Sequence, residues 1–161
     1  MPTSSVLPKT ISVVRAAVSL FFLSFGEYKL AGPGFAHGGF QNYLHEYITT
    51  DAVSFYRPVL TGLVSPHAVF FGYFVGVLES FVGVCLLLGI WVRPASVVGI
   101  FFLLNLTLST WWDAGHGVAW WHYFGARLDT LPILLLLVIF YAADAGRVWG
   151  LDGYRGRRQK L

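Results

Sequence analysis

Glu79 has the clearest potential for chemistry in this sequence, because it lies inside an almost entirely apolar stretch, GYFVGVLESFVGVCLLLGI. The stretch belongs to a helix predicted over 66–92, and Glu79 is about 13 residues, roughly 20 Å, from either end of it. A charged carboxylate in the middle of a membrane costs at least about 2.5 kcal/mol. We therefore expect Glu79 to be protonated and to bond a polar side chain at the same depth.

Three other polar residues are predicted within the membrane. Asn105 and Thr107 lie on the next helix at a depth similar to that of Glu79, and they are the favoured partners. Arg15 lies only about 8 Å from one membrane surface, so we expect its long side chain to reach toward water. Two interpretations stay open: Glu79 and Asn105 join two helices, or Glu79 serves a proton or quinone site, since acids within membranes are candidates for function.

Histidines and aromatic residues form a second candidate site. All five histidines are predicted on one side of the membrane, and WWHYF places one of them among aromatic rings. An imidazole can donate a hydrogen bond to a quinone carbonyl, aromatic faces can hold the ring, and nearby acids can supply protons. The candidate quinone-binding residues are Trp121, His122, Tyr123, Glu27 and Asp129. The alternative is an aromatic belt that contacts lipid.

Motifs for other cofactors are missing from the sequence. There is no HxxxH or HxH pair, so we predict no metal site, and there is no GxGxxG, P-loop or CxxC. Quinone is therefore the one cofactor that the sequence favours. Cys85 is expected to be a packed and inert thiol inside a helix.

The composition requires membrane-spanning helices to position these residues. The chain of 161 residues is 56% hydrophobic and only 12% charged, and its apolar runs are long enough to cross a hydrocarbon layer of about 30 Å. Lipid cannot satisfy an open backbone, so the runs must be helical. We predict an all-α membrane protein, a bundle of four transmembrane helices in a single domain. The helices are expected at about 10–30, 66–92, 95–112 and 127–146.

The basic residues predict the orientation. Lys and Arg are concentrated on the side that carries both chain ends and the link between the second and third helices, and a basic tail covers 153–161. Both termini should therefore lie in the cytoplasm. We expect a multi-pass protein of a bacterial or archaeal cytoplasmic (inner) membrane. Its positive charge favours anionic lipid over nucleic acid.

The first outer loop carries its own helical pattern. Phe40, Leu44 and Tyr47 recur on one face of FQNYLHEYI, which predicts a short helix lying in the membrane interface.

Three segments in order resemble the DoxX family of small four-helix membrane proteins: FGEYKL, GVLESFVGVCLLLGIWVRPAS and AADAGRVWGLD. The resemblance implies a link to the small DoxD subunit of thiosulfate:quinone oxidoreductase and to membrane redox assemblies. The C-terminal motif contains Asp144, Gly146, Arg147 and Asp152. Asp144 and Arg147 are three residues apart and can pair, Asp152 can bond the backbone of its own turn, and the motif should fix the end of the bundle.

Several functions fit this sequence. The first is a membrane subunit of a redox or respiratory-type complex, which anchors a partner and contributes to a quinone site without necessarily being catalytic itself. The alternatives are a structural accessory subunit of a respiratory or photosynthetic complex and a small proton-linked carrier. Partners would be the lipid bilayer and other membrane subunits or further copies of the chain. A stripe of small residues favours the first function, because it could contact a partner helix: Gly72, Gly76, Ser80 and Gly83.

Overall fold

The structure is a computed structural model that describes residues 6–32, 34–109 and 130–158. All regular elements in these ranges are helical. Three helices are long and apolar enough to cross a membrane: α1 (Val6–Ala31), the continuous stretch that ends in α4 (Ala68–Leu88), and α5 (Val92–Ser109). The predicted fourth span is represented by the shorter apolar helix α7 (Thr130–Ala142). The structure therefore supports a membrane-type helical protein, and the fourth crossing stays a prediction.

Several predicted helix bounds are corrected by the structure. α4 ends at Leu88, because Gly89 adopts a left-handed backbone conformation (φ +64°) and caps it. α5 begins at Val92, so Pro94 lies in its first turn, where its missing N–H is tolerated. α7 ends at Ala142, before the predicted limit of 146, and the basic tail begins as a helix, α8 (Leu151–Arg158). The predicted helix ends at 110–112 and 127–129 lie outside the described residues.

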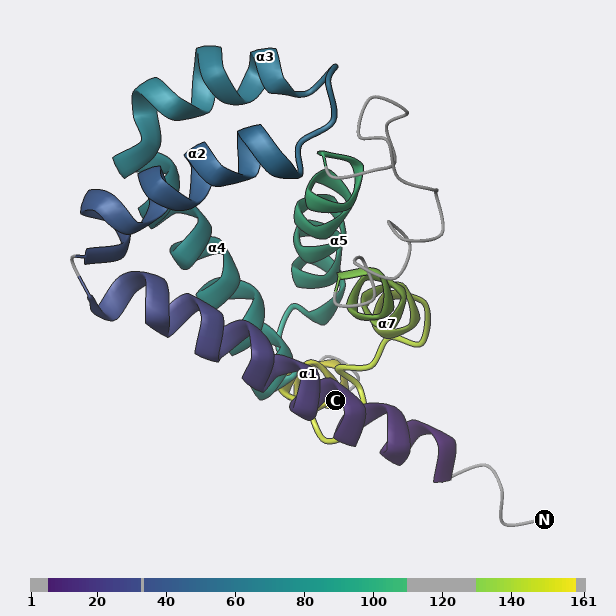
Figure 1. Cartoon of the computed structure of the whole chain (residues 1–161). Helices are drawn as coiled ribbons and strands as arrows, with labels where there is room; N and C mark the ends of the chain where they lie inside the picture. Colours follow the sequence, from purple (N-terminus) through teal and green to yellow (C-terminus); the bar gives the residue numbers. More distant parts are fainter. Residues whose placement is uncertain (1–5, 33, 110–129, 159–161) are drawn as a thin grey trace.

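The bundle consists of packed helix pairs. α1 packs along α4, α4 contacts α5, and α5 packs against α7, as Figure 1 shows. Their shared core is apolar and includes Val82, Leu86 and Phe140, none of which is exposed to solvent. Leu137 of α7 packs directly over Gly99 of α5, which lets these two helices approach closely.

The stripe of small residues on α4 holds α1 rather than a partner. A side-chain carbon on Gly83 would lie 2.8 Å from Leu23, and one on Gly26 of α1 would lie 2.8 Å from the backbone nitrogen of Ser80. Gly72 faces Ala36 in the same manner. The stripe is therefore used inside the chain, and its prediction as a free partner surface is wrong.

A helical cap covers one end of the bundle (Figure 1). It consists of a wide turn (Phe35–Gly39), α2 (Phe40–Thr50) and α3 (Arg57–Val59), and the chain then continues through Leu60–Val64 and Ser65–His67 into α4. Phe40, Leu44 and Tyr47 are buried on one face of α2, which confirms the predicted helix and its apolar face. The hydroxyl groups of Tyr47 and Ser109 share a hydrogen bond that ties the cap to α5.

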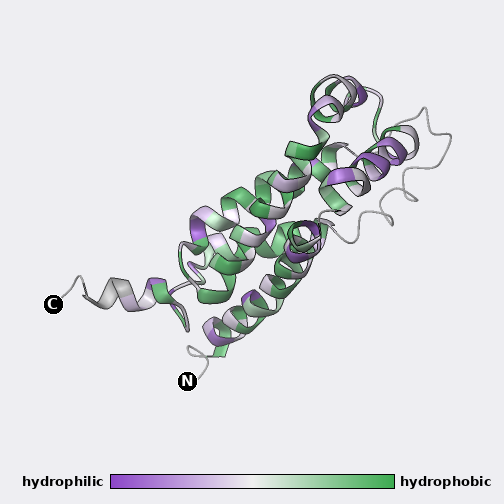
Figure 2. Cartoon of the chain, turned by 90° about the vertical axis from the view of Figure 1, so that its left-hand side faces the viewer, coloured by the Kyte–Doolittle hydropathy of each residue, from purple (hydrophilic) through white to green (hydrophobic). Residues whose placement is uncertain are grey.

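The long helices consist mostly of apolar residues (Figure 2). Large side chains on three of them point away from the core, including Phe21, Phe74 and Phe101, and Phe101 is 76% exposed. Such a surface is unfavourable in water but suits lipid tails. It supports contact with a lipid bilayer.

Candidate functional site

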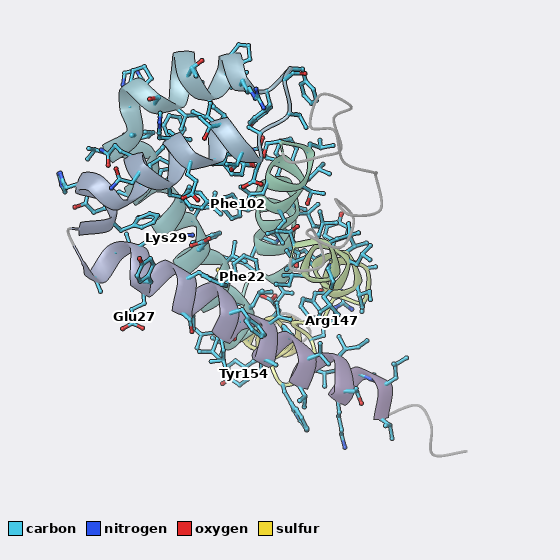
Figure 3. All side chains as sticks on the ribbon, in the orientation of Figure 1. Phe22, Glu27, Lys29, Phe102, Arg147 and Tyr154 are labelled. Carbon is cyan, nitrogen blue, oxygen red and sulfur yellow. The ribbon has the colours of Figure 1, made fainter. Side chains whose placement is uncertain are left out.

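A buried ion pair joins α1 to α4. The Lys29 ammonium donates to both carboxylate oxygens of Glu79, at 2.5 and 2.6 Å. The two side chains are only 16% and 8% exposed. Figure 3 shows Lys29 directed into the bundle, whereas Glu27, two residues earlier, points away from it.

Glycines bring the two charged residues together. A side-chain carbon on Gly76 would lie 3.0 Å from the Lys29 Cβ, so α1 approaches the α4 backbone directly at this level. Glu79 follows Gly76 by three residues and therefore lies about one turn further along the same face of α4. The Lys29 ammonium group can therefore reach the Glu79 carboxylate while α1 and α4 stay in close contact.

Aromatic rings surround the ammonium group. Lys29 Nζ lies 5.8 Å from the ring centre of Phe25 and 5.9 Å from that of Phe35. A cation within about 6 Å of an aromatic face is attracted by the negative charge density of the ring. These contacts stabilise a charge that the apolar surroundings would otherwise disfavour.

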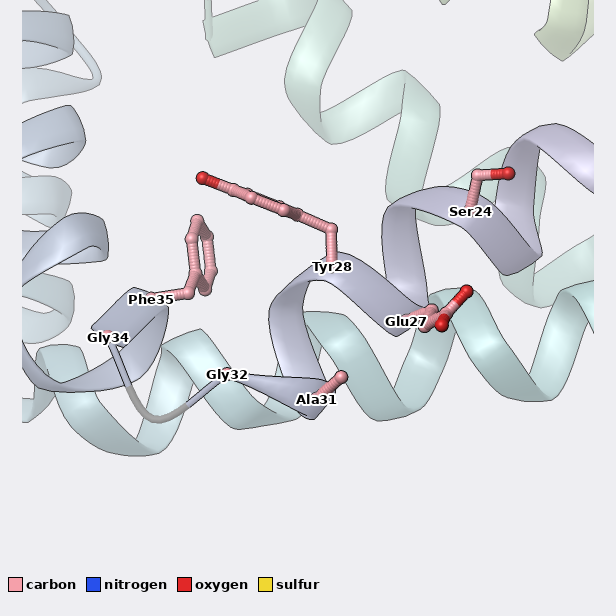
Figure 4. Close-up of a pocket in the computed structure, with 7 residues that line it drawn as sticks. All are labelled: Ser24, Glu27, Tyr28, Ala31, Gly32, Gly34 and Phe35. Carbon is pink, nitrogen blue, oxygen red and sulfur yellow. The ribbon is translucent and has the colours of Figure 1, made fainter.

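An open pocket of about 610 Å³ lies at the C-terminal end of α1, and neither Lys29 nor Glu79 lines it. Figure 4 shows the Tyr28 and Phe35 rings facing each other in the pocket wall, with Ser24 and Glu27 on the same side of α1. The two ring centres are 5.6 Å apart and meet edge to face. Phe35 lines the pocket and also lies near the Lys29 ammonium, so this one residue connects the pocket to the ion pair.

The predicted partners of Glu79 bond elsewhere. Asn105 accepts a hydrogen bond from the hydroxyl of Tyr56 in the cap. The Thr107 hydroxyl donates to the backbone oxygen of Leu103 at 2.8 Å. The expectation that one of them bonds Glu79 is therefore wrong, because α1 and not α5 supplies the partner.

Arg15 is also placed differently from the prediction. It is 2% exposed and does not reach outward to water. Its Nη2 donates to the backbone oxygen of Trp149 at 3.1 Å, while Ser12, one turn earlier, donates to the backbone oxygen of Val148 at 2.8 Å. Arg15 therefore fastens the C-terminal segment to α1.

Asp152 adds a further contact between the C-terminal segment and the rest of the bundle. We call this contact region the clasp and define it as residues 144–153 with Arg15 and the turn 89–92. The Asp152 carboxylate accepts hydrogen bonds from the backbone nitrogens of Trp91 (2.9 Å) and Val92 (3.1 Å). These groups begin α5 and have no partner within that helix. The predicted bond to the backbone of its own turn is therefore replaced by a cap on another helix.

The rest of the C-terminal motif agrees with the sequence. Arg147 forms the predicted ion pair with Asp144. Gly146 lies against Asp152 and Val92, where a side-chain carbon would come within 2.9 Å of Val92 Cγ2. These contacts hold the motif against the start of α5.

Asp152→Ala should destabilise the folded chain by about 1–2 kcal/mol, because two helix-terminal N–H groups lose their acceptor. The free energy of unfolding in detergent micelles measures this effect. Glu46→Ala is the matched control, since the Glu46 side chain is exposed on α2. Equal stability of the two variants would contradict the capping role.

Most of the candidate quinone residues lie outside the described residues: Trp121, His122, Tyr123 and Asp129. Glu27 is described, and it lines the pocket beside Tyr28. Within residues 6–32, 34–109 and 130–158, no three His, Cys, Asp or Glu side chains gather as a metal site would require.

In the comparison with known proteins, the model of the DoxX family matches residues 10–112, which include most of α1, the cap, α4 and α5. No curated protein and no solved structure matches the chain. The matched region contains both members of the ion pair and the described pocket residues.

Proposed function

Because the chain belongs to the DoxX family, we propose that it is an integral membrane subunit of a redox complex that contributes a quinone site beside the Lys29–Glu79 pair. Its membrane would be the bacterial or archaeal inner membrane, with both termini in the cytoplasm. Its partners would be other membrane subunits or further copies of the chain.

The buried ion pair is the observation that carries this proposal. A buried pair contributes little net stability, since apolar residues of similar volume often serve a core as well or better. Ionisable groups within membranes are accordingly associated with proton and substrate pathways. A quinone that receives two electrons also takes up two protons. The pair can supply a proton next to the ring, while the electrons would come from a redox partner subunit.

The pocket has the chemistry that a quinone headgroup requires. Tyr28 and Phe35 offer aromatic faces for the ring, and Ser24 and Tyr28 offer hydroxyl groups that can donate to its carbonyl oxygens. Glu27 lies on the same side of the pocket as a further proton carrier. The residues Trp121, His122, Tyr123 and Asp129 stay part of the proposal on the grounds of sequence.

One observation favours a second function, that of a structural accessory subunit. The Lys29–Glu79 bond joins α1 to α4 where the two helices pack closely, so it would also hold them together without any ligand. The exposed apolar faces would then contact lipid and a larger complex.

Binding of a short-chain quinone analogue tests the pocket. In chains reconstituted in lipid nanodiscs, Tyr28→Leu should weaken this binding about two- to tenfold, because stacking on one aromatic side chain is worth roughly 0.5–1.5 kcal/mol. Phe101→Leu is the matched control, an equally exposed aromatic residue on α5 that does not line the pocket. Equal affinities of wild type and both variants would reject this pocket as the quinone site.

A further inference from the structure

Two arginines converge on one carboxylate of the clasp. Asp144, just beyond α7, pairs with Arg147, and the Nε of Arg93 at the start of α5 lies 3.7 Å from the same carboxylate. The Arg93 and Arg147 side chains are 52% and 74% exposed, whereas Asp144 is 19% exposed. The guanidinium groups therefore lie at the surface and the carboxylate lies behind them.

This group of three side chains retains a positive charge and unused donors. Each guanidinium has five N–H groups in a planar fork, and a single carboxylate cannot accept all of them. Arg93 Nε also donates to the backbone oxygen of Tyr141 at 3.3 Å, and its guanidinium lies 5.7 Å from the Tyr141 ring centre. Arg93 is thus held in place with its outer N–H groups toward the surface.

Exposed aromatic residues occur in the same segments as these arginines. Trp91 and Trp149 belong to the clasp and are more than half exposed, and Tyr154 is similarly exposed on α8. Trp and Tyr concentrate where membrane meets water, because their rings prefer apolar surroundings and their N–H or O–H groups prefer polar ones. In the sequence, exposed apolar side chains follow on α5, such as Val97, and precede on α7, such as Ile139.

We propose that Arg93 and Arg147 together bind the phosphate of an anionic phospholipid headgroup, with Trp149 and Trp91 at the boundary between headgroup and acyl chains. Guanidinium groups bind phosphate oxygens through paired N–H donors. A lipid fits better than a soluble anion, because the arginines adjoin exposed aromatic and apolar surface that would take the acyl chains. Figure 2 shows α8 projecting away from the bundle at this end, and its sequence contains three more arginines.

Native mass spectrometry of the purified chain with added phosphatidylglycerol or phosphatidylethanolamine tests this site. The double substitution Arg93→Gln with Arg147→Gln should weaken phosphatidylglycerol binding at least about tenfold, because each cation near anionic lipid contributes roughly fivefold. Binding of zwitterionic phosphatidylethanolamine should not change. Unchanged phosphatidylglycerol binding by the double variant would overturn the proposal.

A second variant moves the affinity in the opposite direction, which a folding defect would not do. Asp144→Asn removes the competing carboxylate, and asparagine tolerates the left-handed backbone of this position (φ +48°). Phosphatidylglycerol should then bind about threefold more tightly. Weaker or unchanged binding by Asp144→Asn would count against the site.

Two controls separate this site from general charge attraction and from a site for soluble anions. Lys9→Gln removes an exposed cation near the start of α1 and should leave phosphatidylglycerol binding unchanged. Millimolar inorganic phosphate should not displace the lipid. A loss with Lys9→Gln equal to that of the double variant, or displacement by phosphate, would overturn the proposal of a specific lipid site.

Discussion

Replacing Glu79 by leucine is expected to destabilise the folded chain by about 3–5 kcal/mol, the scale observed when one partner of a buried ion pair is removed. The reason is that Lys29 would keep a buried positive charge with no carboxylate to balance it. Lys29→Met should have a similar effect, because it leaves the Glu79 carboxylate alone. Equilibrium unfolding in mixed micelles measures both changes.

The double variant Lys29→Met with Glu79→Leu should recover most of this loss, to within about 1 kcal/mol of the wild type. Both charges are then absent, and methionine and leucine are apolar residues with volumes similar to those of the lysine and glutamate that they replace. Additive losses in the double variant would show that the two side chains do not act as a pair, and they would contradict the bond between α1 and α4.

Gly89→Ala should disrupt the clasp and destabilise the chain by about 2–4 kcal/mol. Its side-chain carbon would overlap Arg15 Nη1 and lie 2.5 Å from the Gly150 Cα, which is too close for any packed atom. In addition, Gly89 has a left-handed backbone (φ +64°) that disfavours a side chain. Equilibrium unfolding in mixed micelles measures this loss. A protease should also cleave the C-terminal segment of the variant faster than that of the wild type.

Gly62→Ala is the matched control for Gly89→Ala. No atom lies within 4 Å of a side-chain carbon built at Gly62, so alanine should be neutral there or slightly stabilising. If Gly89→Ala unfolds at the same denaturant concentration as Gly62→Ala, the close packing of the clasp is wrong.

The sequence predicted those features that local pattern controls. Apolar runs identified the long helices, because their length and composition leave a membrane helix as the only way to satisfy the backbone. The spacing of Phe40, Leu44 and Tyr47 predicted the buried face of α2, and the separation of Asp144 and Arg147 predicted their ion pair. In each case the partners lie within one or two turns of each other.

The partner of Glu79 depends on which helices touch and at what height, and local spacing does not contain that information. Lys29 follows the first apolar run, and that position in the sequence is typical of a membrane boundary. A signal for its real position was present: Gly26 precedes it by one turn, and Gly76 precedes Glu79 by three residues. Small residues on both helices favour a close α1–α4 contact, and that contact brings Lys29 to Glu79.

The clasp was only partly predictable for the same reason. Arg15 and Asp152 each bond backbone groups far away in the sequence, at Trp149 and at Trp91 and Val92. The helix-capping need of α5 was foreseeable, since every helix begins with N–H groups that lack partners. Which acid supplies the cap is decided by the return of the chain after α7, and the sequence does not show that path.

The amount of quinone that stays bound to each chain after mild extraction from native membranes tests the central claim most directly. The comparison is between wild type and the double variant Lys29→Met with Glu79→Leu, which should fold but lacks the buried charges. We expect wild-type chains to retain quinone and the double variant to retain at least about tenfold less, in line with a loss of roughly 1.4 kcal/mol or more. Equal quinone content in two equally assembled proteins would contradict the proposal and leave the pair as a structural connection between α1 and α4.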